Sequence, residues 1–216
     1  MITLDGVSGS GKSSTARELA RVLGYAYLDT GAMYRALTWS LLQNGCDVHV
    51  EADVCRYVER GMDFSFRSGE LLYFGRPLSD AIHHQEVSQH VAVLSRYSCV
   101  RREMISQQRK LALQAEQGLV AEGRDMGTVV FPEADLKVFM EASLELRGSR
   151  RQKQWEKKGV QVSKEDIMKD LAARDEMDTN RTQSPLRKAK DARVLDTSSL
   201  NFKEQVDQIL RWVCED

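Results

Sequence analysis

A glycine-rich stretch near the start of this chain constrains its fold more than any other feature. Residues 6–13 read GVSGSGKS and match the pattern G-x-x-x-x-G-K-[ST] at every defined position. An apolar run at residues 2–4 predicts a buried strand before it, and apolar residues at helical spacing follow it up to Gly24. A strand, a glycine-rich turn and a helix together indicate a phosphate-binding loop, because backbone N–H groups and the helix N-terminus both attract an anion.

The pattern also assigns roles within this loop. We expect Lys12 to reach the outer phosphates of a nucleoside triphosphate, and the Ser13 hydroxyl to bind the Mg²⁺ that accompanies them. A glycine-rich turn that fits the pattern by chance is the alternative, and the flanking strand and helix disfavour it. The residues expected at the triphosphate are Gly6, Val7, Ser8, Gly9, Ser10, Gly11, Lys12, Ser13 and Ser14.

The composition is ordinary for a globular protein. The 216 residues suit one α/β domain with a small insertion, and the formal net charge of −1 gives no sign of a polyanion-binding chain. Neither a signal-like leader nor a run of 18 apolar residues is recognised, so we expect a cytoplasmic protein with no membrane partner. Four cysteines never form C-x-x-C, and we interpret them as reduced thiols rather than disulfide or zinc ligands: Cys46, Cys55, Cys99 and Cys214.

Apolar runs alternate with helical patterns along most of the chain. Together they predict a parallel three-layer α/β/α sandwich with right-handed crossovers. The five expected strands are residues 2–4, 25–28, 118–121, 136–140 and 192–196. The expected helices after the first include residues 100–117, residues 144–158 and one capped by Ser163.

Residues 46–92 differ from this alternation. Two short β patterns flank a glycine turn at residues 67–69, which predicts an antiparallel hairpin and therefore an inserted subdomain. His83, His84 and His90 lie nearby without a metal-binding pattern, and we interpret them as part of a polar helix surface.

Polar residues follow several of the expected strands. In an open parallel sheet, ligands bind beyond the carboxyl ends of the strands, which places Thr30, Arg35, Arg124 and Asp125 near a ligand. A solvated arginine is an equal alternative for Arg35, and a surface salt bridge is the weaker alternative for Arg124 and Asp125. Arg101 lies in the first turn of a helix, where a positive charge is favourable only if it faces an anion or a base.

A basic segment spans residues 147–193, with 14 Lys/Arg against 8 Asp/Glu. Phosphoryl transfer needs charge neutralisation and exclusion of water, and arginine binds phosphate bidentately. We therefore predict a helical lid that closes over the triphosphate. A solvated basic face or a nucleic-acid patch is the alternative, and the segment has little of the aromatic interleaving that stacks bases. The lid arginines are Arg147, Arg150, Arg151, Arg174 and Arg181.

Several segments, in this order, closely resemble the bacterial cytidylate kinase family over nearly the whole chain. They are residues 6–13, LDTGAMYR at 28–35, EGRDMGTVVFP at 122–132, and SPL at 184–186 with Asp191 and Ala192. The resemblance implies transfer of the ATP γ-phosphate to CMP or dCMP with Mg²⁺, giving CDP or dCDP. We also expect a monomer that binds nucleotides and no nucleic acid. The resemblance also implies a five-stranded P-loop kinase domain with three parts: a core (1–45, 93–146, 192–216), a monophosphate-side insertion (46–92) and a lid (147–191).

The resemblance further implies residue roles. Arg147 and Arg151 join the loop at ATP, and Lys12, Arg124, Arg174 and Arg181 form the catalytic set. The CMP site would comprise Thr30, Arg35, Arg101, Arg124, Asp125, Asp178 and Arg181. Asp125 would accept a hydrogen bond from the cytosine amino group, because a carboxylate accepts but cannot donate. Asp178 would hold the ribose hydroxyls.

The chain departs from the family pattern at two positions. Val7 replaces the usual proline of the loop, where backbone N–H groups do the binding. Ala92 stands where the family often has a serine that reaches cytosine, so that contact is missing or is supplied by Ser88 or Ser95. Other hypotheses are another small P-loop kinase, such as an adenylate or shikimate kinase, and a nucleotide-dependent RNA-binding module that uses the basic segment.

Overall fold

The computed structural model describes residues 1–67, 69–157 and 159–215. The chain forms two compact units. We call Met1–Leu23 with Val120–Asp216 the P-loop unit, and Gly24–Leu119 the middle unit. None of the helices within the described ranges is long and apolar enough to cross a membrane.

A five-stranded sheet confirms the predicted α/β class. Its strand order is β2-β6-β1-β7-β8. Strand β1 pairs in parallel with β6 and β7, with Leu4 opposite Glu122 and Val138, and β7 pairs in parallel with β8. The bounds are β1 Ile2–Gly6, β2 Ala26–Asp29, β6 Leu119–Glu122, β7 Leu136–Glu141 and β8 Arg193–Asp196.

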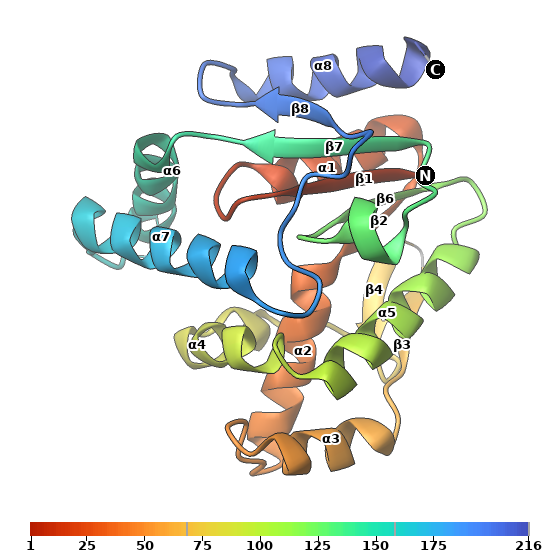
Figure 1. Cartoon of the computed structure of the whole chain (residues 1–216), viewed down its shortest axis with the longest axis vertical. Coiled ribbons are helices and arrows are strands. Elements are labelled where there is room, and N and C mark those ends of the chain that lie inside the picture. The colour runs from red at the N-terminus through yellow and green to blue at the C-terminus, as the bar shows by residue number, and fades with distance from the viewer. Residues whose placement is uncertain (68, 158, 216) are drawn as a thin grey trace. The chain divides into compact units, whose positions relative to one another are not determined.

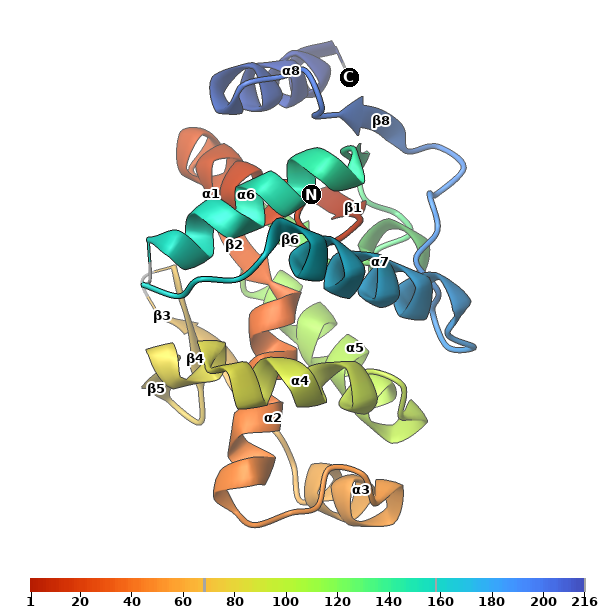
Figure 2. The same ribbon diagram turned by 90° about the vertical axis from the view of Figure 1, so that its left-hand side faces the viewer.

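Helices flank the strands of the P-loop unit. Helix α1 follows β1 and packs against the C-terminal helix α8, which also contacts β7. Helices α6 and α7 pack against each other, as Figures 1 and 2 show. The bounds are α1 Lys12–Leu23, α6 Leu144–Glu156, α7 Lys164–Asn180 and α8 Phe202–Glu215. The predicted Ser163 cap is confirmed, because its hydroxyl accepts the N–H of Asp166 at 3.0 Å.

Helix α2 forms the centre of the middle unit. Its residues Met33, Leu37 and Leu41 are completely buried, and helices α4 and α5 pack against it. The helices of this unit are α2 Thr30–Gln43, α3 Glu51–Glu59, the 3₁₀ turn η1 Asp80–His83, α4 Gln85–Leu94 and α5 Ser98–Leu113.

The predicted hairpin in the middle unit is confirmed and gains a third strand. Strands β3 Phe64–Arg67 and β4 Glu70–Tyr73 pair antiparallel, and β5 Arg76–Pro77 pairs with β4. Phe64 and Tyr73 are partners across β3 and β4 and stack with ring centroids 4.6 Å apart, which holds the two strands of the hairpin together. Ser68 of the predicted turn lies outside the described residues.

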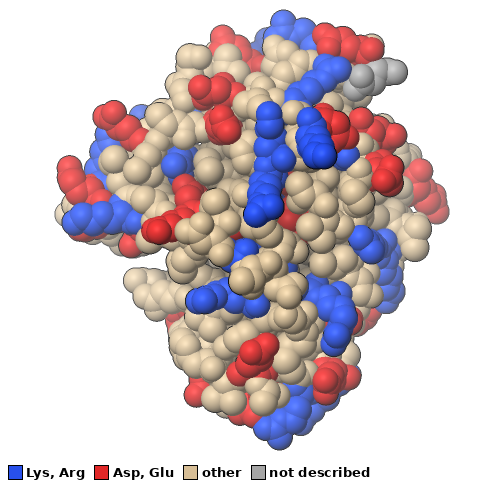
Figure 3. All heavy atoms as spheres, viewed as in Figure 1, with Lys and Arg blue, Asp and Glu red and all other residues tan. Residues whose placement is uncertain are grey.

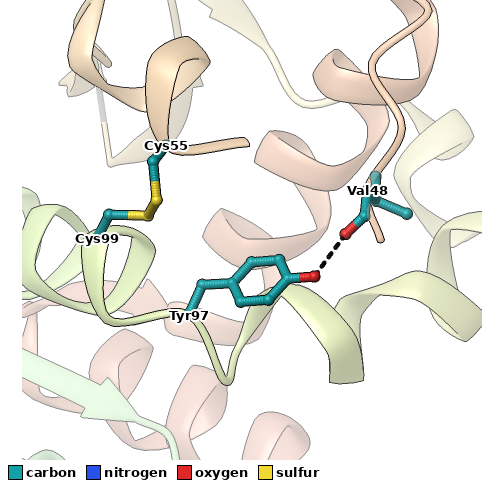
Figure 4. The surroundings of a disulfide bond; sticks show 4 residues. All are labelled: Val48, Cys55, Tyr97 and Cys99. Carbon is teal, nitrogen blue, oxygen red and sulfur yellow. Dashed lines mark hydrogen bonds between the residues drawn. A yellow bond between two sulfur atoms is a disulfide. The ribbon is translucent and has the colours of Figure 1, made fainter. Parts of the chain in front are cut away.

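Two of the cysteines contradict the prediction of reduced thiols. Cys55 on α3 and Cys99 on α5 form a disulfide, with Cα atoms 5.7 Å apart (Figure 4). The prediction was wrong because it relied on sequence spacing, whereas packing of α3 against α5 brings together residues 44 positions apart. Beside this bond the Tyr97 hydroxyl donates to the Val48 carbonyl at 3.0 Å. Cys46 and Cys214 are free thiols, as expected.

Several predicted boundaries also shift. Helix α5 begins at Ser98 and ends at Leu113, rather than spanning residues 100–117. Helix α6 ends at Glu156, and Lys158, its predicted last residue, lies outside the described residues. The stretch predicted as a polar loop after β6 contains a π-helical turn, η2 Met126–Val130, whose buried residues include Met126 and Val130.

Candidate active site

The predicted phosphate-binding loop joins β1 to α1 in the P-loop unit. Gly9 and Gly11 adopt positive φ angles of 78° and 100°, where a side chain is strained. A Cβ at Gly6 would collide with the backbone carbonyl of Met140 on the neighbouring strand β7. The glycine pattern therefore follows from backbone curvature and from close contact with the sheet.

Lys12 begins helix α1 and points back into the loop. Its ammonium donates to the Val7 carbonyl at 2.6 Å, and the residue is only 5% exposed. Burial and, next, the nearby positive charge of Arg124 lower the pKa of Lys12 to about 7, although Glu122 and Asp5 act in the opposite direction. An anionic phosphate would stabilise this buried ammonium.

Helices α6 and α7 hold the loop from the other side. Arg147 donates to the Ser8 carbonyl at 3.0 Å and pairs with Asp175. The carboxylate of Asp175 also accepts the Ser8 N–H at 2.9 Å. An acidic group thus occupies one of the backbone donors that a phosphate oxygen would use.

The arginines of α6 differ in their surroundings. Arg150 donates to the Ser10 carbonyl at 3.2 Å and to Thr197, so it supports the loop directly. Arg151 is exposed and lies over the ring of Trp155, 5.9 Å from its centroid. Sequence analysis placed both residues in the lid and assigned only Arg151 to ATP, because helical spacing alone does not fix which side faces the loop. The ATP contact of Arg151 stays a prediction.

A network of charges lies at the end of β6. Arg124 donates to Asp178 of α7 at 2.7 Å. Arg181 lies 3.7 Å from Asp178 and 3.8 Å from Asp125, and donates to the Ser184 carbonyl at 2.7 Å. The structure therefore brings together four residues that sequence analysis had assigned to the CMP site.

Electrostatics within this network favour the charged forms. Burial alone would raise the pKa of Asp178, but the charge and hydrogen bond of Arg124, helped by Arg174 and Arg181, outweigh it and lower the pKa. Burial alone would lower the pKa of Arg124, and Asp178 reverses this, so the pKa is raised. A charged ligand can bind at such a site by taking the place of one member of an ion pair.

The remaining predicted site residues belong to the middle unit. Thr30 is 4% exposed and begins α2, whose N-cap Asp29 accepts the Ala32 N–H at 2.7 Å. The same carboxylate pairs with Arg35 at 3.2 Å. Arg101, 3% exposed, donates to the Ser95 carbonyl at 3.4 Å.

The serine substitutes proposed for Ala92 lie on or beside helix α4. Ala92 and Ser88 are both within the helix and half-buried. Ser95 follows its end, and its hydroxyl donates to the Ala92 carbonyl at 3.0 Å. Ser95 would have to give up this bond to reach a base.

The predicted histidine surface is also in this region. His83 and His84 are exposed, and the His90 ring packs edge-on against His49 at 5.5 Å. Within the described ranges, one group has metal-ligand spacing, namely Glu51 with the two cysteines of the disulfide. Sulfurs bonded to each other do not provide thiolate ligands.

The Ser13 side chain, next to Lys12, fits a magnesium ligand. Ser13 is exposed at the first turn of α1. Mg²⁺ prefers oxygen ligands, keeps several waters and often uses few protein groups beside substrate phosphates. An exposed hydroxyl next to the loop lysine meets these requirements.

Comparison with known proteins agrees with this geometry. The family profile described as cytidylate kinase matches residues 2–215. The chain belongs to the cytidylate kinase family. A cytidylate kinase of Carboxydothermus hydrogenoformans is 42% identical, with 97% of this chain and 95% of that protein aligned. One of Anoxybacillus flavithermus is 40% identical over 97% of this chain and 93% of that protein. The protein is therefore a kinase, as predicted from its motifs.

Solved structures agree on the fold. A shikimate kinase from Bacteroides thetaiotaomicron has a TM-score of 0.50 at 11% identity, covering 98% of this chain and 97% of that one. An uncharacterised protein from Eubacterium ventriosum has a TM-score of 0.55 at 11% identity, covering 100% and 98%. At such low identity these likenesses establish the α/β architecture only.

Proposed function

We propose that this cytidylate kinase family member transfers the γ-phosphoryl group of ATP to CMP and dCMP, giving CDP and dCDP. The observation that carries the proposal is the buried ammonium of Lys12 inside the glycine-rich loop. A lysine with a pKa lowered to about 7 gains most from an anionic partner, and the glycine-rich pattern leads us to expect that loop N–H groups bind the same anion.

In this proposal the loop and Lys12 bind the ATP phosphates, and Ser13 holds Mg²⁺. The metal would supply charge neutralisation at the β- and γ-phosphates. Asp175 must leave the Ser8 N–H before a phosphate oxygen can accept it, and Arg147 then loses a carboxylate partner. Since Asp175 lies on α7, ATP binding would be coupled to movement of the proposed lid, residues 147–191.

Binding of the acceptor nucleotide would replace ion pairs in the charge network around Arg124. Arg124, Arg174 and Arg181 would neutralise phosphate charge as the γ-phosphoryl group moves, replacing their present carboxylate partners. Asp125 would then accept the cytosine amino group and Asp178 the ribose hydroxyls. In the middle unit, Arg35 and Arg101 would bind the CMP phosphate, with Thr30 beside the nucleotide.

The remaining proposals concern the protein's surroundings. We propose a cytoplasmic monomer whose partners are nucleotides, with no nucleic acid. The formal net charge of −1 supports the last point, because a nucleic-acid-binding surface concentrates positive charge. Both acidic and basic side chains are present on the face shown in Figure 3. The division into core, insertion 46–92 and lid is likewise proposed.

The test is ADP release from ATP and Mg²⁺ with CMP, dCMP, UMP, AMP and shikimate offered as acceptors. We expect fast turnover with CMP and dCMP and little with UMP. Comparable turnover with UMP would retain the kinase and overturn the proposed discrimination of cytosine from uracil. No turnover with any of the five would overturn the proposed acceptor class.

A further inference from the structure

Asp5 is a buried carboxylate that neither phosphate binding nor acceptor binding has yet explained. It lies on β1 directly before the glycine-rich loop and is 5% exposed. Its two oxygens each accept one backbone N–H, from Met126 and from Gly127, both at 2.8 Å. The two N–H groups follow Arg124 and Asp125 immediately in the sequence.

This pair of hydrogen bonds fixes the turn after Asp125. Met126 and Gly127 begin the π-helical turn η2, so their N–H groups have no earlier turn of helix to donate to. Packing around the turn is tight: a Cβ at Gly127 would lie 3.1 Å from the Thr3 hydroxyl. With two bonds to one carboxylate, the turn can neither rotate nor slide along β1.

Burying a carboxylate at this position is energetically unfavourable. The pKa of Asp5 is raised to about 6, mainly by burial and also by the negative charge of Asp125, while the two N–H groups and Lys12 oppose the rise. A neutral amide would be easier to bury, but it offers one oxygen where Asp5 uses two. Two simultaneous, charge-assisted hydrogen bonds give the greater positional precision.

We infer that Asp5 is a positioning residue for acceptor recognition, which holds Arg124 and Asp125 in place through the backbone N–H groups of Met126 and Gly127. It touches neither nucleotide. The inference rests on the proposed function, because it assigns the benefit of this contact to CMP binding. Strand β1 would then support both the turn that follows Asp125 and the phosphate-binding loop at its own end.

The test is Asp5→Asn, compared with Thr3→Val as the matched control. Asn keeps one acceptor and turns an amide toward the second N–H. Thr3 is buried on the same face of β1, and valine conserves its shape. We expect Asp5→Asn to raise the KM for CMP about tenfold while the KM for ATP stays within about twofold. Thr3→Val should change neither.

A pH series separates positioning from a general loss of structure. Above pH 6 the native Asp5 is ionised and accepts both N–H groups; below it, a protonated carboxyl accepts less well and resembles asparagine. The ratio of CMP KM values, variant over native, should therefore fall toward one between pH 7.5 and pH 5. The CMP phosphate titrates in the same range with both proteins, so this ratio is unaffected by it.

The outcomes are distinct. A folded Asp5→Asn with an unchanged KM for CMP, equal rises for both substrates, or a ratio independent of pH would overturn the inference. If Asp5→Asn does not fold, the native protein alone tests the inference. Its KM for CMP should then rise on acidification by more than the titration of the CMP phosphate explains, and the absence of this additional rise would overturn the inference. If the native protein does not phosphorylate CMP at all, the proposed function fails instead, and the two failures are distinguishable in one assay.

Discussion

The two units of this protein bury different kinds of side chain. Among the described residues, the P-loop unit buries charged groups on β1, α1, β6, β7 and α6 and just before η2: Asp5, Lys12, Glu122, Asp125, Lys137 and Arg147. In the middle unit the buried charged residue is Arg101, and the unit is held by the apolar face of α2, the stacked hairpin and the disulfide. Buried charge is unfavourable for folding, so we expect these groups in the P-loop unit to serve binding at the expense of stability.

Replacing Lys12 should have the largest effect on function and little on folding. In Lys12→Ala we expect phosphoryl transfer to fall by at least about 10³-fold, because the charge that meets the ATP phosphates is lost. Removing an ammonium whose pKa is already lowered to about 7 should not lower the free energy of unfolding near neutral pH.

Steady-state turnover and a denaturant titration measure the two quantities. Arg21→Ala, an exposed change on the same helix α1, is the control and should retain activity. Normal turnover by folded Lys12→Ala would remove the loop from the active site.

The middle unit should respond in the opposite way to loss of its cross-link. Reduction, or Cys55→Ser, should lower the free energy of unfolding by roughly 2–4 kcal/mol, because the bond closes a loop of 44 residues in the unfolded chain. The stability change should be seen equally with and without bound nucleotide.

Denaturant midpoints with and without reductant provide the measurement, and mass spectrometry verifies the oxidation state. Cys214→Ser is the control, since Cys214 is a free, exposed thiol. An unchanged midpoint for a protein shown to be oxidised would mean that apolar packing alone holds the middle unit.

A substitution at Asp125 tests whether a buried charge in the P-loop unit acts on CMP binding alone. In Asp125→Ala we expect CMP binding to weaken by about 1–3 kcal/mol, with ATP binding unchanged, because a hydrogen bond to a charged acceptor is lost. Arg181 also loses a carboxylate 3.8 Å away.

Calorimetric titration with each nucleotide separately measures both affinities. The conservative Asp125→Asn serves as a matched variant, since it keeps the shape but can donate to a carbonyl, and should shift preference toward UMP. Equal weakening of ATP and CMP binding would show that Asp125 acts on the whole unit rather than on the acceptor.

The smallest expected effect is the uptake of a proton when ATP binds. Because the folded pKa of Lys12 is about 7, the lysine is largely neutral at pH 8 before ATP binds. Phosphate oxygens favour the charged form, so binding at pH 8 should take up close to one proton, and ATP affinity should decline as pH rises above 7. Calorimetry in buffers of different ionisation enthalpy detects this uptake. Its absence would mean that Lys12 is already charged in the free protein.

Local features of the sequence determined much of this structure. The strand before the loop at residues 6–13, the end of α1 before Gly24 and the Ser163 cap of α7 follow from residue types and spacing within about ten positions, and the structure confirms them. Membership of the cytidylate kinase family was equally readable, because its segments are continuous in the chain.

Tertiary structure alone decided the contacts between distant segments. Asp5 meets Met126 across 121 positions, Asp175 meets Ser8 across 167, and Cys55 meets Cys99 across 44. The first two contacts were missed and the disulfide was wrongly predicted, and the sequence did not show that Arg150 supports the loop through the Ser10 carbonyl. The physical reason is that periodicity encodes which face of an element is apolar, whereas the partner of a buried polar group depends on how whole elements pack.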